Sequence, residues 1–391
     1  MKKFFCLFLS IFCILNLYSQ HYSATSANKK TALRYLALAK KYYLQGQYNN
    51  AITTCDNALK YNDSIGDIYY LKAASKNQLN DPRNEILPII ENSLNNLEWV
   101  DYNSTNARIL YANILCSIGQ NQKAIEVLDN EPFIYSSEAE YIRIKSLYQM
   151  NTIDSIEKAR QKVDSARRVY PKDIRFFYVF FNYEYRLRNI LDPNTNTFIV
   201  NNENNFDYKI ADSFIKNIPN YDKSYNDLEI LASFFATGEN KARLISAFDA
   251  RGFKHILYPL IALEEKIISQ EDAVDYFLTF FDKPIDSNIL YRFISMITES
   301  DTKKYLLDSL NAFDGIITYD INNTLEPNLI VKYERGRPQN ITCDIDNNQK
   351  IDFEILCDFG EIKSFTNFSN GLKLDYANYP NVILATLNEN N

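Results

Sequence analysis

Residues 43–61, YLQGQYNNAITTCDNALKY, carry the spacing that decides the fold. Gly46 is followed by Tyr48, then by Ala51 and, seven residues later, by Ala58. A glycine permits the left-handed backbone that ends a helix. Alanines two turns apart leave room on one side of a helix for a neighbouring backbone. The spacing therefore predicts two short antiparallel helices joined by a tight turn at Gly46.

The same spacing returns further along the chain, in ILYANILCSIGQNQKAIEVLDN (109–130) and in SIEKARQKVDSARRVYPKD (155–173). Segments 66–79 and 137–150 have the periodicity of further first helices. A single helix pair cannot bury its own apolar face, so the repetition predicts a stack of pairs. The residues that repeat the pattern are Gly119 and Ala124 in the first copy, and Ala159, Ala166 and the helix-ending Pro171 in the second.

With these copies, residues 30–190 resemble the tetratricopeptide repeat (TPR) family, whose unit of about 34 residues is a helix, a turn and a second helix. The best unit runs from Tyr35 to Tyr61. It departs from the family pattern at Ala39, where glycine is usual, and at Asp63, where proline is usual. The resemblance implies an α-solenoid that acts as an adaptor or scaffold and binds proteins or peptides in its concave groove.

On the residue pattern, Lys40, Tyr43 and Asn113 fall on the groove-facing side of the first helices. We predict that they bind the partner, although each is equally compatible with an ordinary solvated residue. Leu36 stands where some relatives carry a basic residue that clamps a peptide carboxylate. Binding of chain termini is therefore not implied.

The first nineteen residues have the pattern of a secretory signal: two lysines, an apolar run over residues 4–17, and Ser19 before the expected cut. We expect a mature chain that is periplasmic, associated with the cell envelope or secreted, and a partner from the envelope. The alternative is an uncleaved anchor, which would be the chain's one membrane contact. Lipidation at Cys13 is disfavoured because Phe12 precedes it.

Composition argues against several function classes. A net charge of −7 without long charged runs is not typical of a surface that binds nucleic acid. The 391 residues include two histidines, His21 and His255, so His-based triads and His-rich zinc sites are not available. We interpret His255 as a helical residue without a catalytic role. No nucleotide-binding or nucleophile motif is present.

We predict a protein that is not an enzyme and has no cofactor. A carboxylate-only envelope hydrolase is an alternative, which requires a pocket where two acids converge.

After the repeats the composition and periodicity of the sequence change twice. Residues 191–221 are Asn-rich and polar, helical periodicity resumes in six segments between residues 227 and 313, and seven short β-branched and aromatic segments follow from Gly315. We predict a mainly α fold: a TPR-type solenoid of antiparallel helix pairs, a helical extension and a small antiparallel β module. The expected divisions are a signal peptide (1–19), the repeats (20–190), a linker (191–221), the extension (222–314) and the β domain (315–391).

CDIDNNQKIDFEI, residues 343–355, resembles the start of a calcium loop, with oxygen-bearing side chains at alternating positions. The candidate ligands are Asp344, Asp346, Asn348 and Asp352. Gln349 replaces the turn glycine, and Ile355 replaces the closing glutamate. A calcium-dependent surface module is therefore an alternative function, and a plain hairpin that turns at Asn347–Asn348 is the simpler interpretation.

Four cysteines follow the signal segment. Cys55 and Cys116 fall on helices and are expected to be small buried side chains. A turn at Asn347–Asn348 would set Cys343 opposite Asp352 and leave Cys357 too far away for a disulfide bond. A bond between these two cysteines would require a wider loop.

Overall fold

The computed structural model describes residues 26–95, 97–188, 191–192, 197–198, 210, 212–214, 227–322, 324–348 and 350–387. The predicted signal segment lies outside these residues, as do Cys13, His21 and most of the predicted linker. Within the linker, β1 (Leu191–Asp192) and β2 (Thr197–Phe198) form a short antiparallel pair where we had expected only a loop. No helix of the described chain combines the length and apolar character needed to cross a bilayer.

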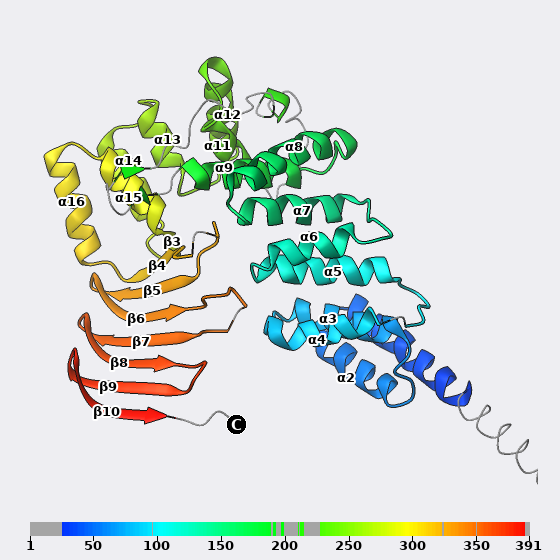
Figure 1. The fold of residues 1–391 in the computed structure, drawn as a ribbon. Coiled ribbons are helices and arrows are strands. Elements are labelled where there is room, and N and C mark those ends of the chain that lie inside the picture. The colour runs from blue at the N-terminus through cyan, green and yellow to red at the C-terminus, as the bar shows by residue number, and fades with distance from the viewer. Residues whose placement is uncertain are drawn as a thin grey trace, which may run out of the picture. The chain divides into compact units, whose positions relative to one another are not determined.

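The chain forms two compact units: residues up to 115 together with 126–134, and residues 116–125 together with 135–391. The repeat helices, shown from blue to green in Figure 1, belong to both. They are a helix over residues 26–44, α2 (Tyr48–Leu59), α3 (Gly66–Gln78), α4 (Arg83–Ser93), α5 (Ser104–Ser117), α6 (Asn121–Asp129), α7 (Ser137–Gln149), α8 (Ile153–Val169) and α9 (Arg175–Arg188).

One left-handed residue joins the two helices of each of the first four pairs. These residues are Gly46, Asn80, Gly119 and Asn151, with φ of 71°, 56°, 73° and 49°, and they recur at intervals of 34, 39 and 32 residues. Asparagine accepts positive φ more readily than other residues with a side chain, so it replaces glycine in the second and fourth turns. The predicted helix pairs are confirmed by this recurring turn.

Small side chains fill the contacts within the pairs. Five alanines of the predicted pattern are buried, with exposed fractions of at most 3%: Ala51, Ala58, Ala124, Ala159 and Ala166. In the first unit, Ala58 lies in a core with Leu36, Cys55 and Ile68. Helix α8 ends at Val169, two residues before Pro171.

The helical extension belongs to the second unit, and all six segments that we predicted are helices. They are α11 (Leu228–Ser233), α12 (Gly238–Ala250), α13 (Tyr258–Glu264), α14 (Gln270–Leu278), α15 (Ser287–Met296) and α16 (Ser300–Asn311). Their aromatic residues form much of the core. Phe277 of α14 stacks on Phe293 of α15 with ring centroids 4.2 Å apart.

The C-terminal sheet has eight strands in the order β10-β9-β8-β7-β6-β5-β4-β3. The seven predicted strand segments are β4 (Gly315–Tyr319), β5 (Leu329–Glu334), β6 (Arg337–Cys343), β7 (Phe353–Asp358), β8 (Glu361–Asn367), β9 (Leu372–Asn378) and β10 (Asn381–Leu387), all antiparallel. Two of their hairpins turn on dipeptides with positive φ at both residues, Arg335–Gly336 and Phe359–Gly360, as in type I′ turns.

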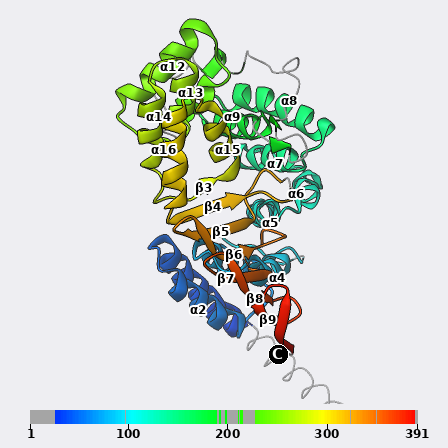
Figure 2. The ribbon, with the colours of Figure 1, turned by 90° about the vertical axis from the view of Figure 1, so that its left-hand side faces the viewer.

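The sheet contains one strand beyond the predicted antiparallel module. β3 (Ile285–Asp286) precedes α15 in the predicted extension and pairs in parallel with β4. Its two residues carry too little pattern to be predicted from sequence. Figures 1 and 2 both show α15 beside this end of the sheet, opposite β10. The predicted fold class is confirmed.

We expect Ala51→Leu to lower the free energy of unfolding by about 1–3 kcal/mol, because Ala51 is fully buried and a larger side chain would overpack the contact. The measurement is urea unfolding followed by circular dichroism. Ala37→Leu is the matched control, because Ala37 is exposed on the helix over residues 26–44; its effect should stay within about 0.5 kcal/mol. Equal effects of the two changes would contradict the packing role of Ala51.

Candidate functional site

Two of the three predicted partner-binding residues are engaged inside the first unit. The Nζ of Lys40 lies 3.0 Å from Oδ2 of Asp101 and 5.4 Å from the ring centroid of Tyr102. The ring of Tyr43 meets that of Tyr48 edge-on at 5.6 Å, and burial raises the pKa of Tyr43. Both side chains therefore help to hold the unit together.

Asn113 lies on α5 and is exposed. Within the described chain, no hydrogen bond or ion pair joins it to Lys40 or Tyr43. The structure thus does not bring the three residues into one contacting set. Their role in binding a partner stays a prediction.

The loop from Asp344 to Asp352 brings three of its four candidate calcium ligands together. Carboxylate oxygens of Asp344, Asp346 and Asp352 lie within 4.8 Å of one another. Each also accepts a main-chain N–H: that of Asn348 donates to Asp344 at 3.0 Å and to Asp346 at 3.2 Å, and that of Ile345 donates to Asp352 at 2.6 Å. These bonds account for the conformation of the loop without an ion, so calcium binding stays a prediction.

The register of this hairpin corrects the predicted two-residue turn. β6 ends at Cys343 and β7 begins at Phe353, and these two residues lie opposite each other, so the loop is wider than Asn347–Asn348. Asn347 does take positive φ. Cys357 lies further along β7, and both cysteines are free thiols.

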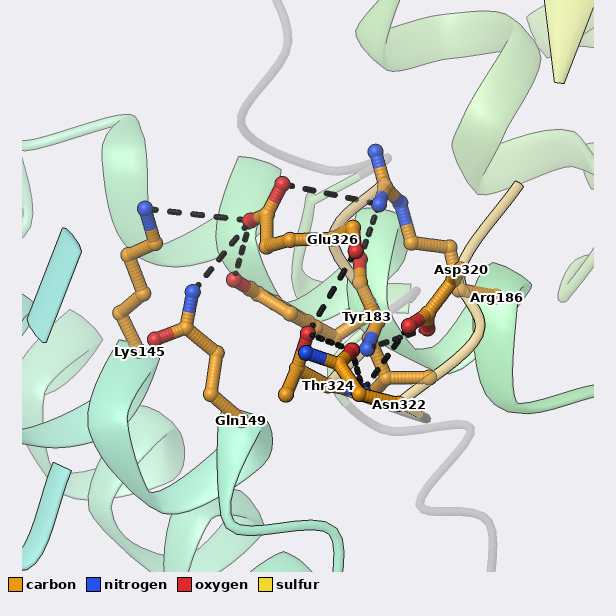
Figure 3. A network of polar contacts seen from close by, with 9 residues as sticks. Lys145, Gln149, Tyr183, Arg186, Asp320, Asn322, Thr324 and Glu326 are labelled. Carbon is orange, nitrogen blue, oxygen red and sulfur yellow. Dashed lines mark hydrogen bonds and ion pairs between the residues drawn. The ribbon is translucent and has the colours of Figure 1, made fainter. Parts of the chain in front are cut away.

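A second polar site lies in the second unit, where the β4–β5 loop meets the repeat helices (Figure 3). The Glu326 carboxylate accepts hydrogen bonds from the hydroxyl of Tyr183 at 2.8 Å and from Nε2 of Gln149 at 3.4 Å. It also pairs with Nζ of Lys145 at 3.8 Å and with Nη1 of Arg186 at 3.7 Å. Four side chains from α7 and α9 thus converge on one acid of the loop.

Neighbouring residues hold the hydrogen-bond donors of this site in place. The thiol of Cys116 donates to Oε1 of Gln149 at 3.3 Å, which directs the amide nitrogen toward Glu326. The ring of Tyr183 stacks on Tyr148 at 5.2 Å, with an interplanar angle of 3°. Burial, and then the charge of Glu326, raise the pKa of Tyr183 well above its usual value, so its hydroxyl keeps the proton that it donates.

The loop itself is held in an unusual conformation. Leu325 has φ of +64°, which a bulky side chain rarely adopts, and its side chain is buried in the helical core. Its carbonyl accepts a hydrogen bond from Arg186. The Asp320 carboxylate accepts the main-chain N–H groups of Leu325 at 2.7 Å and Thr324 at 3.1 Å. The contacts around the loop thus stabilise a conformation that leucine disfavours.

We expect Glu326→Gln to lower the free energy of unfolding of the second unit by about 1–3 kcal/mol, because it removes the charge that four side chains surround. A double-mutant cycle with Tyr183→Phe should give a coupling energy of about 1 kcal/mol or more, since the two groups share one hydrogen bond. Urea unfolding provides both values. Glu334→Gln, on an exposed strand position, is the control. Additive effects of the two changes would show that the hydrogen bond contributes nothing.

Beside this loop lies a cavity of about 310 Å³, lined by residues of α9, α11, α15, the segment before α13 and the β4–β5 loop. Its ionisable lining residues include Arg186, Asp227, His255, Asp286 and Asp320. The interpretation of His255 as helical was wrong: it precedes α13, and its Nδ1 accepts the N–H of Leu257 at 3.2 Å. Its Nε2 lies 3.8 Å from Oδ2 of Asp227, and burial lowers its pKa to about 4.

The cavity meets the condition set for the carboxylate-only alternative, a pocket where at least two acids converge. Two of the three aspartates already serve the backbone: Asp320 holds the β4–β5 loop, and Asp286 caps α15 by accepting the N–H of Asn288 at 2.8 Å. Burial raises the pKa of Asp320, although the N–H groups of Leu325 and Thr324 oppose this shift, and burial also raises the pKa of Asp227. These contacts give Asp286 and Asp320 structural roles and assign none of the three acids a reaction.

We expect acid to destabilise the second unit through His255. Its folded pKa of about 4 lies below the unfolded value of about 6.5, so the unfolded chain binds more protons between these values. The stability that this pKa difference provides is fully present above pH 6.5 and is lost as the pH falls towards 4. Between pH 7 and 4.5 the wild type should lose about 2 kcal/mol more than His255→Gln in urea unfolding. Parallel losses in the two proteins would contradict this assignment.

Sequence reasoning missed the cavity and the Glu326 site because their residues are far apart in the chain. Lys145 and Glu326, for example, are separated by 181 positions. The one available signal was the scarcity of histidine, which singled out His255 without indicating its surroundings.

Comparisons with known proteins find similarity among solved structures. No protein-family model and no curated protein sequence matches the chain. The chain is similar to YrrB, described as a TPR protein with an unusual peptide-binding site, at 20% identity over 42% of this chain and 87% of that one, with a TM-score of 0.32. It is similar to the P58(IPK) TPR domain at 12% identity over 71% of this chain and 98% of that one, with a TM-score of 0.22. Both neighbours contain TPRs.

Proposed function

We propose that this chain is an exported, non-catalytic scaffold that binds a protein or peptide of the cell envelope. Export rests on the pattern of residues 1–19, and the scaffold role rests on the helix pairs and on the C-terminal sheet. Stacked helix pairs commonly present extended surfaces to peptides and partner helices. The sheet adds a second kind of surface, and one strand of it carries the proposal.

That strand is β10, which forms the outer edge of the sheet and, among the residues that the structure describes, pairs with β9 alone. Charged residues and proline usually protect an edge strand from pairing with another chain. The sequence of β10, NVILATL, contains neither. Four of its apolar side chains are 48–69% exposed: Val382, Ile383, Leu384 and Leu387. An extended segment of a partner would extend the sheet and cover these side chains.

The predicted groove is the other candidate surface. Lys40 and Tyr43 already contact Asp101, Tyr102 and Tyr48, so a partner would have to compete with these contacts. The edge strand needs no such exchange, because its outer main-chain groups have no neighbouring strand in the described sheet. For this reason we place the partner at β10.

We expect Ile383→Lys to weaken binding of the partner about tenfold or more, because a charge on the exposed edge opposes strand addition. The partner is captured from envelope extract with residues 20–391, identified and purified, and its affinity for each variant is then measured by calorimetry. Ile153→Lys is the matched control, because Ile153 is 89% exposed on α8 and distant in sequence from the sheet. It should bind like the wild type.

A third variant separates the two surfaces. Lys40→Ala, Tyr43→Ala and Asn113→Ala, combined in one chain, should leave the affinity within about twofold of the wild type if β10 is the site. Loss of binding in this folded variant, together with normal binding by Ile383→Lys, would move the site to the groove. No partner for the wild-type chain would contradict the scaffold proposal itself.

A further inference from the structure

The cavity beside the β4–β5 loop remains unexplained by a scaffold role. At about 310 Å³ it has the size of a small-ligand site, and five separate parts of the second unit contribute to its wall. Polar groups and apolar side chains such as Leu231 and Ile289 share the lining. Its chemistry indicates which ligand it suits.

The lining carries a surplus of negative charge. Three carboxyl groups face it, from Asp227, Asp286 and Asp320, whereas its two basic side chains are Arg186 and His255. Arg186 is committed to Glu326 and to a main-chain carbonyl. His255 is neutral at pH 7, because burial lowers its pKa to about 4. A cation would offset the carboxylates that these groups leave uncompensated.

The spacing of the aspartates argues against a metal ion. In the part of the chain that the structure describes, acidic side chains come within 4.8 Å of one another in groups of three only in the 344–352 loop. Asp227, Asp286 and Asp320 do not form such a group. A larger cation, with its charge on an extended group, can reach acceptors on different walls.

Aromatic and apolar walls complete the site. Tyr178 and Tyr185 of α9 line the cavity, and aromatic faces attract organic cations. The aliphatic side chains would cover a short carbon chain. Arg292 stacks on Phe234 at 5.5 Å and does not line the cavity, so it is not one of the basic groups that face the ligand.

We propose that this cavity binds an organic cation, an ammonium or guanidinium group on a short carbon chain, through Asp227, Asp286 and Asp320. The group belongs either to a free small molecule or to a lysine or arginine side chain of a peptide. This inference is independent of the proposed scaffold function, because the cavity and β10 involve different residues.

Isothermal titration of residues 20–391 tests it with n-butylammonium and n-butylguanidinium, beside neutral n-butyramide and anionic n-butyrate. We expect binding of a cation and no measurable binding of the neutral and anionic probes. Asp227→Asn keeps the shape of the side chain and removes its charge, so it should weaken cation binding about tenfold. Asp249→Asn is the control, because Asp249 lies outside the cavity and accepts a hydrogen bond from Tyr258; it should bind like the wild type.

The peptides acetyl-Gly-Lys-Gly-amide, acetyl-Gly-Arg-Gly-amide and acetyl-Gly-Gln-Gly-amide separate the two sources of the group. Binding of the butyl cations alone supports a free small molecule, and binding of a basic peptide but not of the Gln peptide supports a side chain of a partner. Three results would overturn the proposal: no binding of any cation, equal binding of cationic and neutral probes, or unchanged affinity in a folded Asp227→Asn. Near-ultraviolet circular dichroism verifies the fold of each variant.

Discussion

The second unit depends on the contacts of the Glu326 carboxylate, because they join the C-terminal sheet to helices of the repeat region. The strongest of its contacts is the hydrogen bond from the buried Tyr183 hydroxyl, since Lys145 and Arg186 are partly exposed and solvent weakens their ion pairs. Tyr183 is positioned in turn by its stack on Tyr148. The Tyr148 hydroxyl donates to Glu184, which Arg160 holds with two hydrogen bonds. A continuous set of polar and aromatic contacts therefore runs from α8 to the β4–β5 loop.

The cavity is formed by the same attachment of the β4–β5 loop to the helices. Asp320 and Leu325, two of its lining residues, belong to the loop that carries Glu326. The disfavoured backbone of Leu325 has a role here, because it directs the side chain into the helical core while its carbonyl faces Arg186. The wall of the cavity and the attachment of the sheet are thus one structural feature.

The repeat helices and most strands were accessible from the sequence because their signals are local. Gly46 and Gly119 mark turns that need a left-handed residue, and the alanines mark close helix contacts. Asn80 and Asn151 occupy the same conformation, yet asparagine is common in this chain and does not single them out. The two residues of β3 were missed for a related reason, since pairing with a distant strand determines their conformation.

The candidate sites were less accessible, because each depends on contacts across long stretches of chain. Periodicity placed Lys40 and Tyr43 on one helix, but Asp101, which pairs with Lys40, lies 61 positions away. The alternating acids of the 344–352 loop did meet, because nine consecutive residues fix their geometry. Their main-chain partners, the N–H groups of Ile345 and Asn348, were not predicted from the sequence.

The parallel pairing of β3 with β4 bears on how this chain can change during evolution. The first strand of the sheet lies within the helical extension, so the β module has no clean boundary at which recombination could transfer it intact. At the other end, successive hairpins follow one another towards β10 with no helix between them. Duplication or loss of a hairpin there would lengthen or shorten the sheet without disturbing the helices. The extension and the base of its sheet therefore form one structural unit, to which the outer hairpins are added by strand pairing.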